Sequence, residues 1–217
     1  MDQQEFLRRI APITVGAIST NCYVVRDKDT CIVVDPGAHG AEIAGAIANE
    51  GLTCTTIVCT HGHHDHVGGV AALKAATGAT YMISEGDAER ATHAIELSSH
   101  VFDVSSDDVT DAPEADVKLK EGDVVRLGDI SLRVMETPGH TEGGIVLVED
   151  EAMVAFVGDT VFEGSVGRTD LVGGDAATLK KTIARLKEEL SPEFVLLSGH
   201  GNPTTMGREL MYNPFFQ

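Results

Sequence analysis

The chain has 217 residues, of which 42% are hydrophobic and 23% are charged, a composition typical of a globular protein with an apolar core. Its net charge is −18, from 34 acidic and 16 basic residues. Because nucleic acids and anionic membranes are bound by clustered lysine and arginine, this charge argues against both partners. No apolar run in the sequence reaches the length of a membrane span.

The N-terminus and the cysteines together predict a cellular compartment. The first twelve residues contain two acids and no long apolar run, so a secretory signal is not expected. The cysteines lie in apolar, strand-like stretches. Without a signal, reduced thiols in a cytoplasmic protein are the better interpretation. The four residues concerned are Cys22, Cys31, Cys54 and Cys59.

The first part of the chain predicts alternating strands and helices. The elements are a hairpin over 22–37, a helix over 41–51, a strand over 54–61, a helix over 66–78 and a strand over 79–84. The hairpin consists of two β-rich runs around a charged turn at 26–29. The second helix is indicated by the helical spacing of Val67, Val70 and Leu73, and a glycine closes each helix.

Residues 85–115 differ, because they are acidic, rich in Ser and Thr, and without a clear period. We interpret them as an irregular excursion with some helix, which could lie beside an active site. Regular order returns with strands expected over 130–140, 143–150, 151–160 and 193–201. The clearest helix lies within 175–192, with Asp175 as its cap and one apolar face formed by Leu179, Ile183, Leu186 and Leu190.

This order of elements predicts the fold class. Strands come as hairpins, with helices at intervals in each half, and no linker-like stretch separates the halves. We therefore expect an α/β (α+β) protein in which two mixed sheets pack face to face with helices outside. This is a four-layer αββα sandwich, formed by a single domain over residues 1–217.

Four of the predicted strands run into a side chain that can bind metal. These side chains are His61, His140, Asp159 and His200. Taken singly, each has a simpler interpretation as a turn residue. Side chains at strand ends converge where a sheet stops, however, so their joint occurrence favours one rigid site.

The stretch CTHGHHDHVGG, residues 59–69, adds further candidate ligands. Alternation along an extended strand end places His61 and His63 on the same side, whereas His64 points away. Asp65 could alternatively cap a helix that begins at His66. The full set has seven members, which one four-coordinate zinc cannot use but two metals with a bridging carboxylate can. Ligands of N and O alone suit zinc, iron or manganese. The set is His61, His63, Asp65, His66, His140, Asp159 and His200.

With HGHHDH followed by PGHT, GDT and GHG in this order, the sequence resembles the metallo-β-lactamase-fold hydrolases. The stretch VGDTVFEGSVGRTDLVGGD is similar to the short, single-domain glyoxalase II-like group of hydroxyacylglutathione hydrolases. The resemblance implies the αββα sandwich with metals at the sheet edges. It implies that His61, His63 and His140 hold one metal, that Asp65, His66 and His200 hold the second, and that Asp159 bridges them.

The resemblance also implies the roles of nearby residues and of the metals. Asp35 would orient a ligand from behind, and Cys59 would be a core thiol. Two divalent ions, zinc in the first place, would make hydroxide available at pH 7 for attack on an acyl carbon. Asp65 would accept the remaining proton. A thiolate leaves readily near neutral pH, so the expected function is hydrolysis of small acyl thioesters such as hydroxyacylglutathione.

Other functions of the same superfamily are alternatives. A persulfide dioxygenase would use one iron held by His61, His140 and Asp159. A flavodiiron oxidase would have Glu in place of His63, and the commonest class of β-lactamase would have Cys in place of Asp159. A metallo-nuclease conflicts with the charge of −18.

The substrate residues are less sharply predicted than the metal ligands. Arg168 and Thr169, in the stretch GRTD, could bind a substrate carboxylate. Arg168 could equally pair with Asp170 or another acid. Recognition of glutathione, the identity of the metal in the cell and the oligomeric state stay open at the level of sequence.

Overall fold

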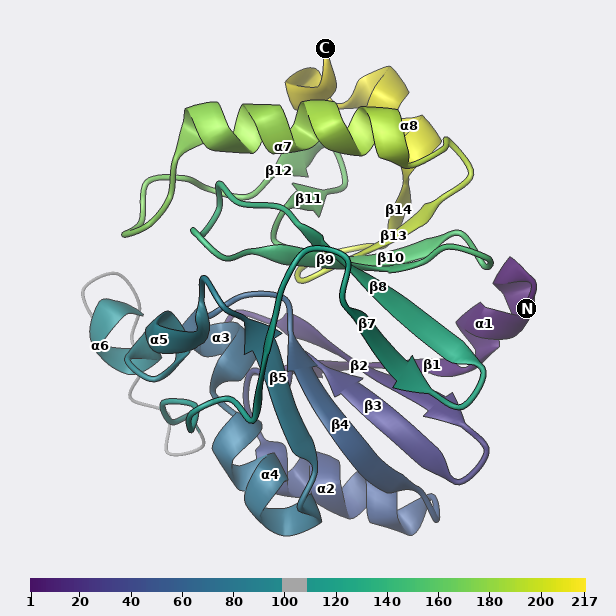
Figure 1. Ribbon diagram of the computed structural model, residues 1–217, viewed down its shortest axis with the longest axis vertical. Helices are drawn as coiled ribbons and strands as arrows, with labels where there is room; N and C mark the ends of the chain where they lie inside the picture. The colour runs from purple at the N-terminus through teal and green to yellow at the C-terminus, as the bar shows by residue number, and fades with distance from the viewer. Residues whose placement is uncertain (99–108) are drawn as a thin grey trace.

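The computed structural model describes residues 1–98 and 109–217, and in this part of the chain two six-stranded sheets lie face to face (Figure 1). Sheet one has the order β1 (Ile10–Val15), β2 (Thr20–Asp27), β3 (Thr30–Val34), β4 (Thr53–Cys59), β5 (Thr80–Ser84) and β6 (Val117–Leu119). Sheet two has the order β14 (Thr204–Thr205), β13 (Val195–Ser198), β10 (Val154–Gly158), β9 (Ile145–Glu149), β8 (Ile130–Glu136) and β7 (Val124–Leu127).

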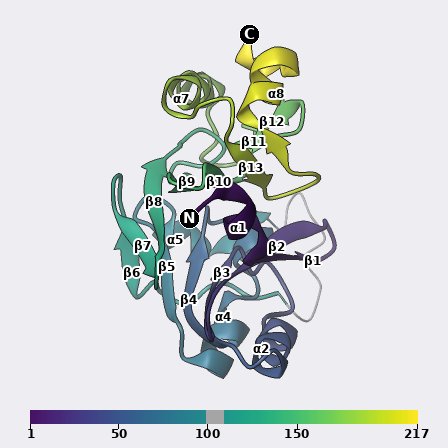
Figure 2. The same ribbon diagram turned by 90° about the vertical axis from the view of Figure 1, so that its right-hand side faces the viewer.

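Helices cover the outer face of each sheet, as Figures 1 and 2 show. Sheet one is covered by α2 (Gly40–Asn49) and α4 (Val70–Thr77), and sheet two by α7 (Ala176–Glu189) and α8 (Met206–Tyr212). The αββα sandwich expected from the sequence is therefore confirmed. The remaining elements are short: α1 (Gln3–Arg8), α3 (His64–Val67), α5 (Ala88–Ala91), α6 (Ala94–Ser98), β11 (Val161–Phe162), β12 (Ser165–Val166) and η1 (Pro214–Phe216).

Three apolar clusters separate the four layers. Successive residues of a strand point to opposite faces of its sheet, so one strand supplies two clusters. In β3, Val33 packs beneath α2 and α4, whereas the neighbouring Ile32 packs between the two sheets. In β9, Leu147 packs between the sheets and Val148 packs beneath α7. The four leucine and isoleucine side chains predicted for the apolar face of α7 are all buried there, which confirms that prediction.

One predicted helix is wrong in its extent. The structure divides 66–78 into α3 and α4, separated by Gly68 and Gly69. A Cβ at Gly69 would lie 2.6 Å from the carbonyl oxygen of Pro36, so the break lets the chain pass close to the turn after β3. The N-cap of α3 is His63, and Asp65 is in the first helical turn instead of capping it.

Other expectations were met or fell short in simple ways. The hairpin of β2 and β3 is confirmed, and Asp175 caps α7 by accepting from the Thr178 amide. Among the elements not predicted are α1 and β7, whose short runs mix apolar and polar residues, and β1, whose run contains Pro12. The 85–115 excursion contains α5 and α6, which confirms some helix, although residues 99–108 lie outside the described part. No described helix has the length and apolarity needed to cross a membrane.

Candidate metal centre

Strand ends bring polar side chains to one edge of the two sheets. His61 comes just after β4, Asp159 after β10 and His200 after β13, while His140 lies in the loop that follows β8. The short helix α3, the next element along the chain after β4, supplies two further candidate ligands, Asp65 and His66. The seven predicted ligands lie together in three overlapping groups, and within each group the candidate ligand atoms lie within 4.8 Å of one another. The groups are His61, His63 and His140; His61, His66 and Asp159; and Asp65, His66 and His200.

We call His61, His63 and His140 cluster one. The three side chains are buried, and His63 Nδ1 lies 2.9 Å from His140 Nε2. The backbone carbonyl of Arg168 lies 2.7 Å from His140 Nδ1 and can accept a hydrogen bond from an N–H at that nitrogen, which leaves Nε2 with a lone pair. Burial, aided by the neighbouring imidazoles, lowers the pKa of His61 far below its usual value and that of His63 to about 3. Neutral imidazoles are the form that binds metal.

We call Asp65, His66 and His200 cluster two. Asp65 Oδ2 lies 3.1 Å from His200 Nε2 and 3.3 Å from His66 Nε2, and Thr20 Oγ1 donates to the same oxygen at 3.2 Å. Burial disfavours charge on His66, but the carboxylates around it, Asp159 foremost, outweigh burial and raise its pKa well above the usual value. The carboxylates of Asp159, Asp65 and Asp35 therefore concentrate negative charge around His66, which divalent cations can neutralise.

Asp159 lies between the two clusters. Its Oδ1 is 3.3 Å from His66 Nε2, and its Oδ2 is 3.6 Å from both His140 Nε2 and His200 Nε2. One carboxylate thus faces ligands of both clusters with its two oxygens. This is the arrangement that a bridging ligand requires.

The donor set fits divalent metals. Within the described residues, His61 Nε2, His66 Nε2 and Asp159 Oδ1 are buried and have no hydrogen-bond partner. Leaving buried polar atoms unpaired is costly, and metal ions at this point would satisfy all three. Imidazole and carboxylate ligands without thiolate suit zinc, iron and manganese.

Asp35 and Thr60 contact the Nδ1 atoms of two candidate ligands, His66 and His61. Asp35 Oδ2 lies 3.0 Å from His66 Nδ1, which directs His66 Nε2 into the centre. This contact with a candidate ligand agrees with the expected position of Asp35. Asp35 also accepts from the backbone amide and the hydroxyl of Thr60, at 2.7 and 2.8 Å. Thr60 Oγ1 lies 3.1 Å from His61 Nδ1. Sequence reasoning missed Thr60, because a threonine before His61 carries no distinct signal.

Two glycines make room for the ligands and were also missed. A Cβ at Gly199 would lie 2.2 Å from Asp159 Oδ1 and 2.5 Å from His66 Cε1. A Cβ at Gly167 would lie 2.0 Å from the backbone oxygen of Asp159. Such contacts are too short for any side chain, so glycine is needed at both positions. Their position within the motifs SGHG and VGR was the available signal.

A pocket of about 480 Å³ opens onto the clusters. The candidate metal ligands His63, Asp65 and His200 form part of its wall. The apolar part of its lining comes from the segments around the clusters, namely Ile18, Phe162, Val166 and Leu171. Ser98, in the acidic excursion, also lines it, which supports the expectation that this segment lies beside the site.

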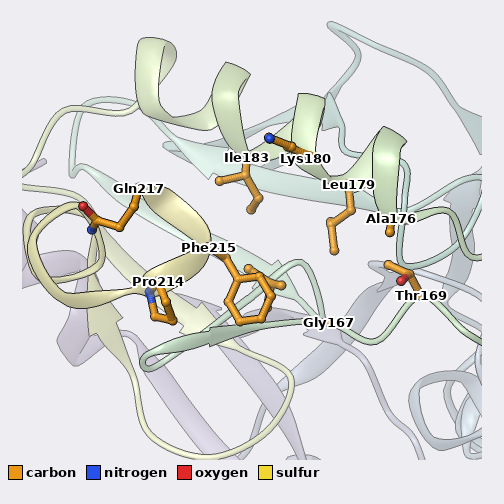
Figure 3. A pocket seen from close by; sticks show the side chains of 10 residues that line it. Gly167, Thr169, Ala176, Leu179, Lys180, Ile183, Pro214, Phe215 and Gln217 are labelled. Carbon is orange, nitrogen blue, oxygen red and sulfur yellow. The ribbon is translucent and has the colours of Figure 1, made fainter.

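The structure places the two candidate substrate residues differently. Arg168 lines the pocket, and its guanidinium forms a two-bond pair with Asp170 at 2.7 and 2.8 Å, the alternative considered from the sequence. Thr169 lines a second pocket of about 330 Å³ (Figure 3). In that pocket Leu179 and Ile183 of α7 face Phe215 of η1. The segment 166–169 therefore forms a wall between the two pockets.

Other residues near the candidate ligands contact the surrounding protein. The Cys59 thiol is fully buried and lies 3.6 Å from the carbonyl oxygen of His66, and burial raises its pKa, in agreement with a core thiol. His64 is buried, with Nδ1 3.7 Å from Asp65 Oδ1. Ser198 Oγ donates to the carbonyl of Val161 at 2.8 Å, which agrees with a structural strand-end residue. The four cysteines are free thiols.

Comparison with known proteins yields matches over nearly the whole chain. Residues 15–200 match the family description "Metallo-beta-lactamase superfamily". Hydroxyacylglutathione hydrolase GloC of Haemophilus influenzae is 31% identical over 94% of this chain and 95% of its own length. The B3 metallo-beta-lactamase BLEG-1 superposes with a TM-score of 0.86 at 31% identity, over 96% of this chain and 99% of BLEG-1. TTHA1623, in a di-iron-bound form, superposes with a TM-score of 0.83 at 32% identity, over 94% and 99%.

Proposed function

Because the chain belongs to the metallo-beta-lactamase superfamily, we propose that it is a dinuclear metal-dependent hydrolase of small acyl thioesters such as hydroxyacylglutathione. The observation that carries the proposal is the pair of ligand clusters with Asp159 between them. Two relatives support it. GloC, named as a hydroxyacylglutathione hydrolase, matches 94% of this chain, and TTHA1623 has been solved in a di-iron-bound form with the same fold.

The residues divide into those that would hold metals and those that act on the substrate. Cluster one would hold one metal, cluster two the second, and Asp159 both. Bound there, two divalent ions would supply a hydroxide at neutral pH. Zinc is the first choice of metal, and iron and manganese suit the same ligands.

Asp65 is the proposed proton acceptor. Its Oδ2 faces the centre and lies within hydrogen-bond distance of Thr20 and His200, so it can hold a proton beside the attacked acyl carbon. Burial opposes ionisation of Asp65, but the charge of the neighbouring His66 and the hydrogen bond with His200 outweigh burial and lower its pKa, which keeps the carboxylate deprotonated. A thiolate is a good leaving group, so no general acid is required.

The pocket lining agrees with a small acyl group as the substrate. Ile18, Phe162 and Leu171 offer apolar contact and limit access of water to the reacting bond. Ser198 Oγ is committed to Val161, so a serine nucleophile has no support at this position. Arg168 is proposed to contact the substrate through the part of its side chain that lines the pocket, with its charge balanced by Asp170.

The test combines metal content with substrate choice. Protein purified without chelator should contain two metals per chain and hydrolyse S-lactoylglutathione. One iron per chain with oxygen uptake on glutathione persulfide would contradict the proposal in favour of a dioxygenase that uses His61, His140 and Asp159. If the protein contains two metals but hydrolyses a β-lactam and no thioester, the proposed metal centre stands and the proposed substrate is wrong.

A further inference from the structure

Asp87 is a fully buried carboxylate outside the ligand clusters. It lies in the turn between β5 and α5 and has no exposed surface. Carboxylates are almost never fully buried unless they are paired. Asp87 forms an ion pair with Arg90, whose Nε lies 3.6 Å from Asp87 Oδ1. Because Asp87 is fully buried, its carboxylate cannot serve solubility or surface charge, and it must have a role inside the protein.

Each oxygen of Asp87 accepts a backbone amide from a different metal-ligand segment. Oδ2 accepts from the Gly62 amide at 2.8 Å, and Gly62 lies between His61 and His63. Oδ1 accepts from the Gly143 amide at 2.9 Å, and Gly143 lies three residues after His140. One carboxylate thus ties together the two backbone segments that supply all of cluster one.

The packing around Asp87 leaves these segments little freedom. A Cβ at Gly143 would lie 2.3 Å from the Asp87 backbone nitrogen, and a Cβ at Gly62 would lie 3.0 Å from the Asp87 carbonyl oxygen. The Ser84 hydroxyl also donates to the Gly143 carbonyl. Both ligand segments therefore lie directly against the turn that carries Asp87.

We infer that Asp87 is a positioning residue that fixes the geometry of cluster one. Amide donors bind a carboxylate acceptor more strongly than a neutral one, so Asp87 sets the separation between the His61–His63 segment and the His140 loop. Cluster two depends on other supports, Asp35 for His66 and Thr20 for Asp65. The inference rests on the proposed metal-dependent function.

The test is the zinc affinity of each cluster in the Asp87→Asn variant. The substitution retains the shape of the side chain but removes its charge and turns an N–H group towards one of the two amide donors. We expect zinc affinity at cluster one to fall about 10- to 100-fold, the usual effect of removing a residue that supports a ligand. Affinity at cluster two should stay within about twofold of the wild type on the same reasoning.

The measurement is a zinc titration of metal-free full-length protein against a chromophoric chelator. Titrations of His140→Ala and His200→Ala identify the binding step that belongs to each cluster. Visible spectra of the cobalt-loaded protein add a readout of ligand geometry at cluster one. The matched control is Asp116→Asn, because Asp116 also accepts a backbone amide, that of Tyr81 at 2.7 Å, but supports no metal ligand segment. This control should bind both zinc ions as the wild type does.

The possible outcomes separate the inference from the proposed function. If the wild type binds two zinc ions and Asp87→Asn binds both with unchanged affinity, or loses both equally, the inference fails while the proposed function stands. If the wild type binds no zinc, the proposed function fails and takes the inference with it. Hydrogen exchange of the wild-type protein needs no variant and covers the case of a variant that does not fold. The Gly62 and Gly143 amides should stay protected after chelation, and their rapid exchange would contradict the role of Asp87.

Discussion

At the scale of single residues, Asp159 connects the two clusters. Its oxygens face His66 on one side and His140 on the other. We predict that Asp159→Ala loses at least one metal per chain and more than about 100-fold in kcat/KM, because a ligand shared by two ions cannot be replaced by either cluster alone. Elemental analysis and steady-state kinetics measure both effects, with the exposed Asp150→Ala as the control. Two metals retained in Asp159→Ala would exclude it as a ligand.

Gly199 tests how closely the ligands are packed. In Gly199→Ala, the new Cβ would overlap Asp159 Oδ1 and the His66 ring. We expect a folded protein with metal affinity weakened about tenfold or more, because the overlap displaces ligands rather than a flexible surface group. The control is Gly45→Ala in α2, where a Cβ meets nothing within 4 Å. That variant should gain about 0.5–1 kcal/mol in stability, since alanine is the better helix former. Chelator competition measures the metal affinity of Gly199→Ala, and urea unfolding measures the stability of Gly45→Ala. An unchanged metal affinity in Gly199→Ala would refute the packing argument.

At the scale of elements, α7 is fastened to sheet two by charge as well as by apolar contact. Arg185 donates to both oxygens of Glu121, and the Glu121 carboxylate also accepts the Glu136 amide at the end of β8. The hydrogen bond from Arg185, more than any other contact, lowers the pKa of Glu121 from its usual 4.5. A carboxyl with a lowered pKa stabilises the fold above its ordinary value, and this contribution is lost as the pH falls through the folded value.

We therefore predict a pH-dependent cost for Glu121→Gln. At pH 7 the free energy of unfolding of the variant should be lower than that of the wild type by about 0.5–1 kcal/mol. The loss is modest because the Arg185–Glu121 pair is partly exposed to solvent. The difference in the free energy of unfolding between variant and wild type should become smaller as the pH is lowered to about 4 and below, because the wild-type carboxylate then begins to bind a proton. Urea unfolding at both pH values is the measurement, and Glu188→Gln on the exposed side of α7 is the control. A difference that persists unchanged in acid would indicate a contact independent of charge.

At the scale of the whole molecule, three apolar clusters hold four layers together without any of the proposed ligands. We predict that metal removal by chelator leaves the far-UV circular dichroism at 25 °C unchanged but lowers the Tm by several degrees. A metal present at 100 times its Kd contributes about 2.7 kcal/mol through mass action. Thermal melts with chelator and after re-addition of zinc measure the shift. Unfolding at 25 °C on chelation would show that the metals are part of the fold itself.

The sequence was informative where a local pattern has one physical meaning. Short apolar runs that end in His61, Asp159 and His200 predicted both the strands and the edge at which the side chains meet. The αββα layers followed from the order of strands and helices. The helix over 66–78 was wrong because its apolar spacing continues across Gly68 and Gly69, and only the approach of the Pro36 turn requires the break.

By itself, the sequence determined the residue types of the candidate metal centre and the chain segments that carry them, because strand ends and motif spacing are local properties. Tertiary structure decided what no local pattern contains: that Asp159 faces both clusters and that Thr169 turns into a second pocket. It also brought the Asp87 carboxylate to the amides of Gly62 and Gly143, which lie 25 and 56 residues away along the chain. The physical reason is that these contacts join separate strand ends and loops, whose relative positions are set by the packing of the two sheets.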